Sequence, residues 1–312
     1  WNGAQPVFNV QLLGTQANYS GPYGSNPALQ GVPGFNEWFY LHQNPDVAAL
    51  VNSGAYATGL DHYLQLGRQQ GRAAFARYHA AAIDLDGPEV ALLAEACSET
   101  GAFAVVGVIE RGGATLYCTV LYFDGAKGLV GKHRKLMPTA GERLIWGFGD
   151  GSTLPVFSTD LGTIGAVICW ENYMPALRMH MYHQGVTLYC APTADDRDTW
   201  LPTMQHIAME GRCFVLTGCQ HITRAAYGPD HESALGDDPA TVMMRGGSAI
   251  IGPLGKVLAG PDFSGETILY AQIDPTEVVR AKFDFDVTGH YARPDVFQLC
   301  VDTKPKLAVK EV

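Results

Sequence analysis

The sequence has 312 residues, of which 47% are hydrophobic and 17% are charged, so it can bury a substantial core in one large domain or two smaller ones. Its formal net charge of −10 argues against nucleic-acid binding, because phosphate binding requires a basic face. No apolar stretch reaches the roughly 18 residues that span a bilayer. We therefore expect neither nucleic acid nor a membrane as a partner.

The cysteines indicate a reducing compartment. Seven are scattered through apolar runs, and their odd number and the lack of a CxxC pair fit reduced cytoplasmic thiols better than a disulfide framework. Cys213 and Cys219 are six apart and His180 and His183 three apart, but neither pair makes a metal site alone. We expect a cytoplasmic protein with no metal ion.

The first quarter of the sequence is atypical. Residues 18–34 are rich in Gly, Pro, Ser and Asn and predict a long loop. Residues 35–72 predict two short helices around Gly54 and are similar to a small helical repeat of bacterial surface and secreted proteins. We therefore place a boundary after residue 72, with an atypical N-terminal region at 1–72 and a regular domain at 73–312.

From residue 73 onward the pattern is regular. A polar turn at 84–87 precedes a helix that begins at Pro88, since proline suits the first helical turn. Strands are predicted at 103–109, 115–123, 128–136, 163–169, 186–192, 213–220 and 267–274, a hairpin at 247–260, and helices near 175–185, 198–212 and 275–283. Strands that alternate with helices and hairpins predict a layered α/β or α+β domain with a mixed sheet.

Cys169 ends the apolar run "TIGAVIC", and helical spacing begins a few residues later, near Pro175. The thiolate is the nucleophilic form of cysteine, and a helix start with a nearby cation favours it. A buried structural cysteine is the alternative for such a position, and we assume that role for Cys118, Cys190 and Cys213. The neighbouring residues must decide between the two.

A basic run upstream supplies the cation. Side chains alternate in an extended segment, so His133 and Lys135 share one face, and Lys132 and Arg134 share the other. Two apolar residues follow Lys135, which predicts a partly apolar pocket where an ammonium stabilises negative charge developing on a substrate atom. A surface turn with an ordinary basic cluster is the alternative.

Six motifs together resemble the nitrilase superfamily of carbon-nitrogen hydrolases. In chain order they read "HRKLMPTAGERLIWGFGDGS", "GAVICWENYMPALR", "YCAPTADDRDTW", "HIAMEGRCFVL", "RGGSAIIGPLGKVLAGP" and "FDFDVTGHYARPDVF". The Cys-Trp-Glu-Asn run resembles the nitrilase and cyanide-hydrolysing branch, because the amidase and carbamoylase branches carry other residues after the cysteine. The resemblance covers residues 73–300, and the N-terminal part does not share it.

The resemblance implies a four-layer αββα sandwich and a Glu-Lys-Cys triad. By motif, the nucleophile maps to Cys169 and the lysine to Lys135. Glu142 maps to a second carboxylate that supports the lysine and the substrate. The backbone N–H of Trp170 would help to hold the charged intermediate. The implied substrate-binding residues are Trp170, Trp146 and Thr193.

The resemblance also implies a reaction. A nitrile or cyanide is converted to the carboxylic acid and ammonia through a cysteine thioimidate and a thioester, without a cofactor. An amide hydrolase with the same triad is one alternative, and an inactive nitrilase-like assembly subunit is another. Members of the superfamily form symmetric dimers that often build spirals, so the resemblance implies a homo-oligomer and helical filaments.

The general base departs from the family pattern. In the family it is the glutamate of a Phe-Pro-Glu run, which this sequence lacks. The nearest candidate is Glu37 in "FNEWF", although Glu37 lies farther ahead of Lys135 than is usual. A glutamate on a helix surface is the alternative for Glu37. The missing run is also what motivates the inactive-subunit alternative.

Overall fold

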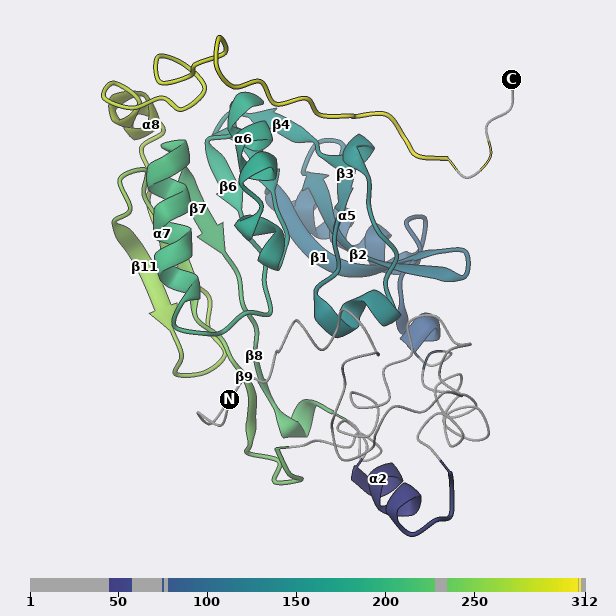
Figure 1. Ribbon diagram of the computed structural model, residues 1–312. Coiled ribbons are helices and arrows are strands. Elements are labelled where there is room, and N and C mark those ends of the chain that lie inside the picture. Colours follow the sequence, from purple (N-terminus) through teal and green to yellow (C-terminus); the bar gives the residue numbers. More distant parts are fainter. Residues whose placement is uncertain (1–44, 58–74, 76–77, 228–234, 308, 310–312) are drawn as a thin grey trace. The chain divides into compact units, whose positions relative to one another are not determined.

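The computed structural model describes residues 45–57, 75, 78–227, 235–307 and 309 (Figure 1). The chain divides into two compact units, Trp1–Ala81 and Ala82–Val312. In the first, helix α2 (Pro45–Asn52) confirms one of the two helices predicted around Gly54. The predicted loop at 18–34 and Glu37 lie outside the described residues, as does most of the segment predicted for the second helix.

The second unit begins with a helix and a three-stranded sheet, as predicted. Helix α5 (Pro88–Thr100) has proline in its first turn. Strands β1 (Ala104–Gly112), β2 (Thr115–Asp124) and β3 (Gly128–Arg134) pair antiparallel in that order. Val90 and Cys97 of α5 pack on Leu121 and Phe123 of β2. One face of this sheet is therefore covered by α5.

A six-stranded mixed sheet forms the larger part of the unit, in the order β11-β10-β7-β6-β5-β4. The central strands β5, β6 and β7 are parallel, and the outer pairs are antiparallel. The strands are β4 (Val156–Thr159), β5 (Gly162–Ala166), β6 (Leu188–Cys190), β7 (Phe214–Thr217), β10 (Ser248–Ile251) and β11 (Val257–Asp262). The predicted hairpin is thus β10–β11, and β8 (His221–Thr223) pairs separately with β9 (Val242–Arg245).

The helices that join the parallel strands also match the prediction. Helix α6 (Pro175–His183) lies between β5 and β6, helix α7 (Trp200–Gly211) between β6 and β7, and α8 (Thr276–Ala281) follows the hairpin (Figure 1). Buried side chains of α6 and α7, including Met181 and Met204, pack on Val215 and Ile251 of the six-stranded sheet. None of the described helices is long and apolar enough to cross a membrane.

The two larger sheets share a core. Val120 and Tyr122 of β2 pack with Ala166 and Ile168 at the end of β5. The backbone N–H of Ala166 also donates to the Tyr122 hydroxyl at 2.9 Å. This contact anchors the carboxyl end of β5, which leads directly to Cys169.

The prediction of a strand at 267–274 is wrong, because this segment has no regular strand structure. Ile268 and Tyr270 are 75% and 81% exposed. Leu269 instead approaches β11 with its side chain, since its Cδ1 lies 2.9 Å from the place where a Cβ on Gly260 would stand. The segment therefore contacts the sheet through a side chain and does not extend it as a strand.

Candidate active site

Cys169 stands at a sharp corner where the chain leaves β5 and enters the short 3₁₀ helix η7 (Cys169–Tyr173). Its φ of +51° lies in the left-handed region, which a residue with a side chain keeps only when its surroundings hold it there. Its N–H donates to the carbonyl of Pro192 at 2.8 Å, and its own carbonyl accepts from Asn172 Nδ2 at 2.8 Å. Hydrogen bonds at its N–H and at its carbonyl therefore hold the Cys169 backbone in this conformation.

Thr193 supplies a hydroxyl to the sulfur. Its Oγ1 lies 3.2 Å from Cys169 Sγ, and the same oxygen accepts from the N–H of Asp195 at 2.8 Å. The hydroxyl hydrogen is then available to the sulfur, where a donor stabilises the thiolate more than the thiol. Because β5 and β6 are parallel, their carboxyl ends bring Cys169 and Thr193 to one edge of the sheet.

Lys135 follows β3 and is buried, with 2% of the residue exposed. Its Nζ donates to Glu142 Oε2 at 2.6 Å and to Thr139 Oγ1 at 3.1 Å, and the Trp146 ring centroid lies 5.8 Å away. An ammonium has three N–H donors. Among the described residues these hydrogen bonds leave one donor for a further acceptor, as an anionic reaction intermediate would provide.

Glu142 is held toward Lys135 by its own helix. It lies in the 3₁₀ helix η5 (Ala140–Leu144), and its Oε2 also accepts from the N–H of Thr139 at 2.5 Å. The N–H of Glu142 donates back to the carbonyl of Thr139 at 2.9 Å. Glu142 cannot leave the lysine without breaking this cap, so the geometry suits support of Lys135.

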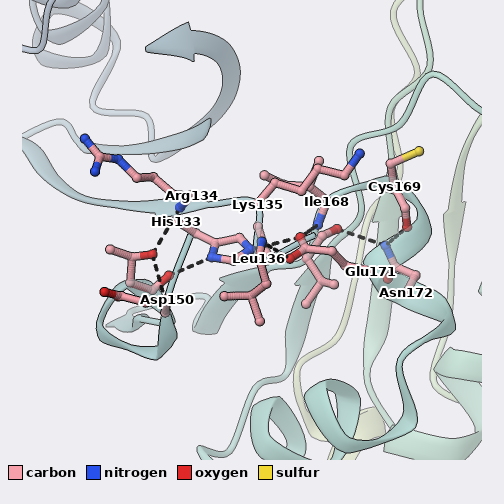
Figure 2. Close-up of polar contacts among 12 residues, drawn as sticks. His133, Arg134, Lys135, Leu136, Asp150, Ile168, Cys169, Glu171 and Asn172 are labelled. Carbon is pink, nitrogen blue, oxygen red and sulfur yellow. Dashed lines mark hydrogen bonds and ion pairs between the residues drawn. The ribbon is translucent and has the colours of Figure 1, made fainter. Parts of the chain in front are cut away.

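Figure 2 shows the Lys135 side chain and the Cys169 thiol extending to the same side of Glu171. Cys118 on β2 contacts both segments: its carbonyl accepts from the N–H of Lys135 at 2.8 Å, and its side chain packs against the cluster that contains Cys169. Burial raises the pKa of the Cys118 thiol to about 12. The segments that carry the predicted lysine, carboxylate and nucleophile therefore converge.

Most of the other cysteines are poor nucleophiles. Burial raises the pKa of the Cys190, Cys213 and Cys219 thiols to about 12 in each case. All seven cysteines lie in the described part of the chain, and none forms a disulfide. At neutral pH these three thiols are protonated, as is that of Cys118, which fits the structural role that the sequence predicted for Cys118, Cys190 and Cys213.

Trp170 lies at the same edge of the six-stranded sheet as Cys169 and Thr193. Its Nε1–H donates to Asp195 Oδ2 at 2.8 Å, and the Arg197 guanidinium lies 4.8 Å from its ring centroid. Burial opposes ionisation of Asp195, but hydrogen bonds from Arg197 and Trp170 outweigh it and lower the pKa of that carboxyl. A nearby hollow is lined by Asp195–Asp198, Trp200, Leu201, Gly246, Gly247, Pro261 and Phe263, and neither Cys169 nor Lys135 borders it.

The structure thus joins Lys135 to Glu142 and Cys169 to Thr193, whereas Glu37 lies outside the described residues. Sequence reasoning missed Glu171 and Asn172, which directly follow the nucleophile in "CWEN". Their position next to Cys169 was the available signal. No group of three or more His, Cys, Asp or Glu residues that could bind a metal occurs within the ranges described.

A family model for carbon-nitrogen hydrolases matches residues 55–283. The chain belongs to the carbon-nitrogen hydrolase family. This confirms the resemblance read from the six motifs, although the match begins before residue 73 and ends before residue 300.

Two bacterial carbon-nitrogen hydrolases are close relatives. Over 261 residues the chain is 70% identical to a nitrilase of Bradyrhizobium diazoefficiens, which covers 83% of this chain and 81% of the relative. Over 258 residues it is 57% identical to an aliphatic nitrilase of Sinorhizobium fredii, which covers 82% of this chain and 83% of the relative. The branch predicted from Cys-Trp-Glu-Asn is therefore confirmed.

The fold also matches that of solved carbon-nitrogen hydrolases. The Helicobacter pylori enzyme superposes with a TM-score of 0.57 at 17% sequence identity, covering 66% of this chain and 73% of that one. At this identity the likeness concerns the fold alone. It agrees with the mixed α/β architecture described above.

Proposed function

We propose that this carbon-nitrogen hydrolase converts a nitrile or cyanide to the carboxylic acid and ammonia, with Cys169 as nucleophile. The observation that carries the proposal is the strained corner that holds Cys169 Sγ 3.2 Å from the Thr193 hydroxyl. The relatives at 70% and 57% identity are nitrilases, which supports a nitrile as the substrate. Lys135 and Glu142 complete the proposed site.

The first step joins enzyme and substrate. The Cys169 thiolate adds to the nitrile carbon, a C–S bond forms, and the nitrogen takes up a proton to give a thioimidate. Negative charge develops on that nitrogen, so a nearby ammonium lowers the barrier. Lys135 suits this task because its ammonium is buried and oriented by Glu142.

Two waters then complete the reaction. The first adds to the thioimidate carbon, and ammonia leaves as the thioester forms. The second adds to the thioester, the C–S bond breaks, and the acid leaves with the thiol restored. Each addition places charge on nitrogen or oxygen, which Lys135 and the backbone N–H of Trp170 would stabilise.

A base must take protons from the thiol and from both waters. Among the described residues, the carboxylates close to Cys169 already have partners: Glu142 binds Lys135, Asp195 binds Trp170 and Arg197, and Glu171 accepts from two backbone N–H groups. Glu37 therefore stays our candidate for the general base.

We also propose the four-layer αββα sandwich for this unit. Its support is the order of packed surfaces: α5 packs on the three-stranded sheet, that sheet on the six-stranded sheet, and the latter on α6 and α7. Two sheets facing each other with helices outside is one of the stable ways to bury four apolar surfaces.

The remaining proposals concern organisation. We keep 1–72 as an N-terminal region and 73–312 as the catalytic domain, which holds most of the family match. We propose a homo-oligomer of dimers that build spiral filaments, supported by large exposed apolar side chains beyond residue 267. The absence of disulfides among all seven cysteines supports a reducing, cytoplasmic location.

Ammonia release from aliphatic and aromatic nitriles, cyanide and the matching amides tests the activity. Wild type should release ammonia from at least one nitrile, and Cys169→Ala from none. Loss of activity in Glu37→Gln would identify the base, whereas an active Glu37→Gln would assign that role to another carboxylate. Turnover of amides alone would favour an amide hydrolase, and no turnover of any compound would favour an assembly subunit.

A further inference from the structure

The carboxylate of Glu171 connects the two segments that carry the proposed lysine and nucleophile. Its Oε1 accepts from the N–H of Leu136 at 2.6 Å, and its Oε2 accepts from the N–H of Ile168 at 3.0 Å (Figure 2). Leu136 directly follows Lys135, and Ile168 directly precedes Cys169. One side chain, only 1% exposed, therefore fixes the backbone next to both residues.

His133, two residues before Lys135, also contacts the Glu171 carboxylate. The imidazole is fully buried, and its Nε2 lies 3.0 Å from Glu171 Oε2. Its Nδ1 lies 2.6 Å from the carbonyl oxygen of Thr153, which can only accept a hydrogen bond. Nδ1 must therefore carry a hydrogen, and this assigns one of the two ring protons.

The contact between His133 and Glu171 needs one more proton. A neutral imidazole with its hydrogen on Nδ1 presents a lone pair at Nε2, and an ionised carboxylate presents another, so the two would repel at this distance. A shared proton removes the repulsion. The 3.0 Å contact therefore holds one hydrogen between Nε2 and Oε2.

We propose that His133 and Glu171 are positioning residues, which together set the place of the Lys135 ammonium relative to the Cys169 thiol. The proposal rests on the function proposed above. With one hydrogen between them the pair has no net charge, so it adds none beside the ammonium. An error of about 1 Å in such a geometry can cost about 100-fold in rate, which is why a rigid connection matters.

Two substitutions of His133 separate positioning from mere packing. In His133→Gln the amide nitrogen takes the place of Nε2 and still donates to Glu171. In His133→Asn the amide nitrogen takes the place of Nδ1, so the Thr153 contact stays and the Glu171 contact is lost. Both variants remove the same buried ring and should lose similar thermal stability.

We expect His133→Asn to lose kcat about 100-fold with KM changed little, and His133→Gln to keep most of kcat. Glu171→Gln should lose kcat as much as His133→Asn does, because the NH₂ group of the new glutamine faces a backbone N–H in either orientation. The alkylation rate of Cys169 by iodoacetamide, followed by mass spectrometry of its peptide, should show the same order. This second readout needs no turnover.

Equal losses in the two His133 variants, or wild-type rates in Glu171→Gln, would overturn the proposal. If wild type hydrolyses no nitrile but Cys169 alkylation still separates Gln from Asn, the proposed reaction fails and the positioning role stands. If the Asn and Glu171 variants do not fold, nitrogen-15 NMR of wild type decides. The spectrum must contain one histidine, missing from the His133→Gln spectrum, whose two ring nitrogens are both hydrogen-bonded. If wild type shows no such histidine, the proposal is rejected.

Discussion

At the scale of single residues, the Thr193 hydroxyl is the contact closest to the chemistry. Thr193→Val keeps the shape of the side chain and removes the donor 3.2 Å from Cys169 Sγ. A hydrogen bond to a charged acceptor is worth about 1.5–3 kcal/mol, so its loss should slow alkylation of Cys169 about tenfold or more. Iodoacetamide alkylation of Cys169 measures this directly.

Thr193→Ser is the matched control, because it keeps the hydroxyl and should alkylate at nearly the wild-type rate. Equal rates for valine and threonine at neutral pH would show that the hydroxyl does not act on the sulfur.

At the scale of elements, helices α6 and α7 are joined by a partly buried ion pair. Arg178 donates to both oxygens of Glu210, at 2.7 and 3.2 Å, and the Tyr182 hydroxyl donates at 2.8 Å. Burial alone would raise the pKa of the Glu210 carboxyl, but these hydrogen bonds outweigh it and lower that pKa. The pair therefore stabilises the fold only while Glu210 is ionised.

Glu210→Gln should lower the free energy of unfolding by about 2 kcal/mol at neutral pH. The native pKa is depressed, so the wild-type advantage is complete above the ordinary carboxyl pKa and disappears as pH falls through the native value. Urea denaturation at pH 7 and below about pH 4 measures both regimes. Asp295→Asn removes an exposed pair with Arg293 and should leave the midpoint unchanged.

The elements also show what could be predicted from the sequence. Alternation correctly put His133 and Lys135 on one face, which the structure shows to be buried, while Lys132 and Arg134 both reach Glu110. Predictions from alternation succeed because the geometry of a single strand places successive side chains on opposite faces. The prediction of a strand at 267–274 failed because the composition of one segment cannot tell whether a partner strand is there to pair with it.

The site was predictable only in part, for a related reason. The motifs located Cys169 and Lys135, but Glu171 reaches Leu136 across 35 positions and His133 across 38. Contacts between residues so far apart in sequence depend on how β3 and the corner after β5 pack. They cannot be predicted from the spacing of neighbouring residues. The positive φ of Cys169 is equally invisible, since cysteine has no preference for it.

At the scale of the whole molecule, the C-terminal part of the chain exposes several large apolar side chains. Ile268, Tyr270, Phe283 and Phe297 are 75%, 81%, 89% and 79% exposed. Single exposed apolar residues are ordinary, but a series of them along one region is costly in water and is typical of association surfaces. This region is therefore where we expect the proposed homo-oligomer to make contacts.

The double substitution Ile268→Asp with Tyr270→Asp should dissociate the oligomer, because two carboxylates cannot be buried there without partners. Sedimentation velocity should show smaller species at the same protein concentration, with unchanged circular dichroism. Leu254→Asp is the matched control: Leu254 is 62% exposed at the tip of the β10–β11 hairpin, away from this region in sequence. If both variants sediment like wild type, the contacts between subunits lie elsewhere; if both dissociate, the effect comes from added charge and not from a particular surface.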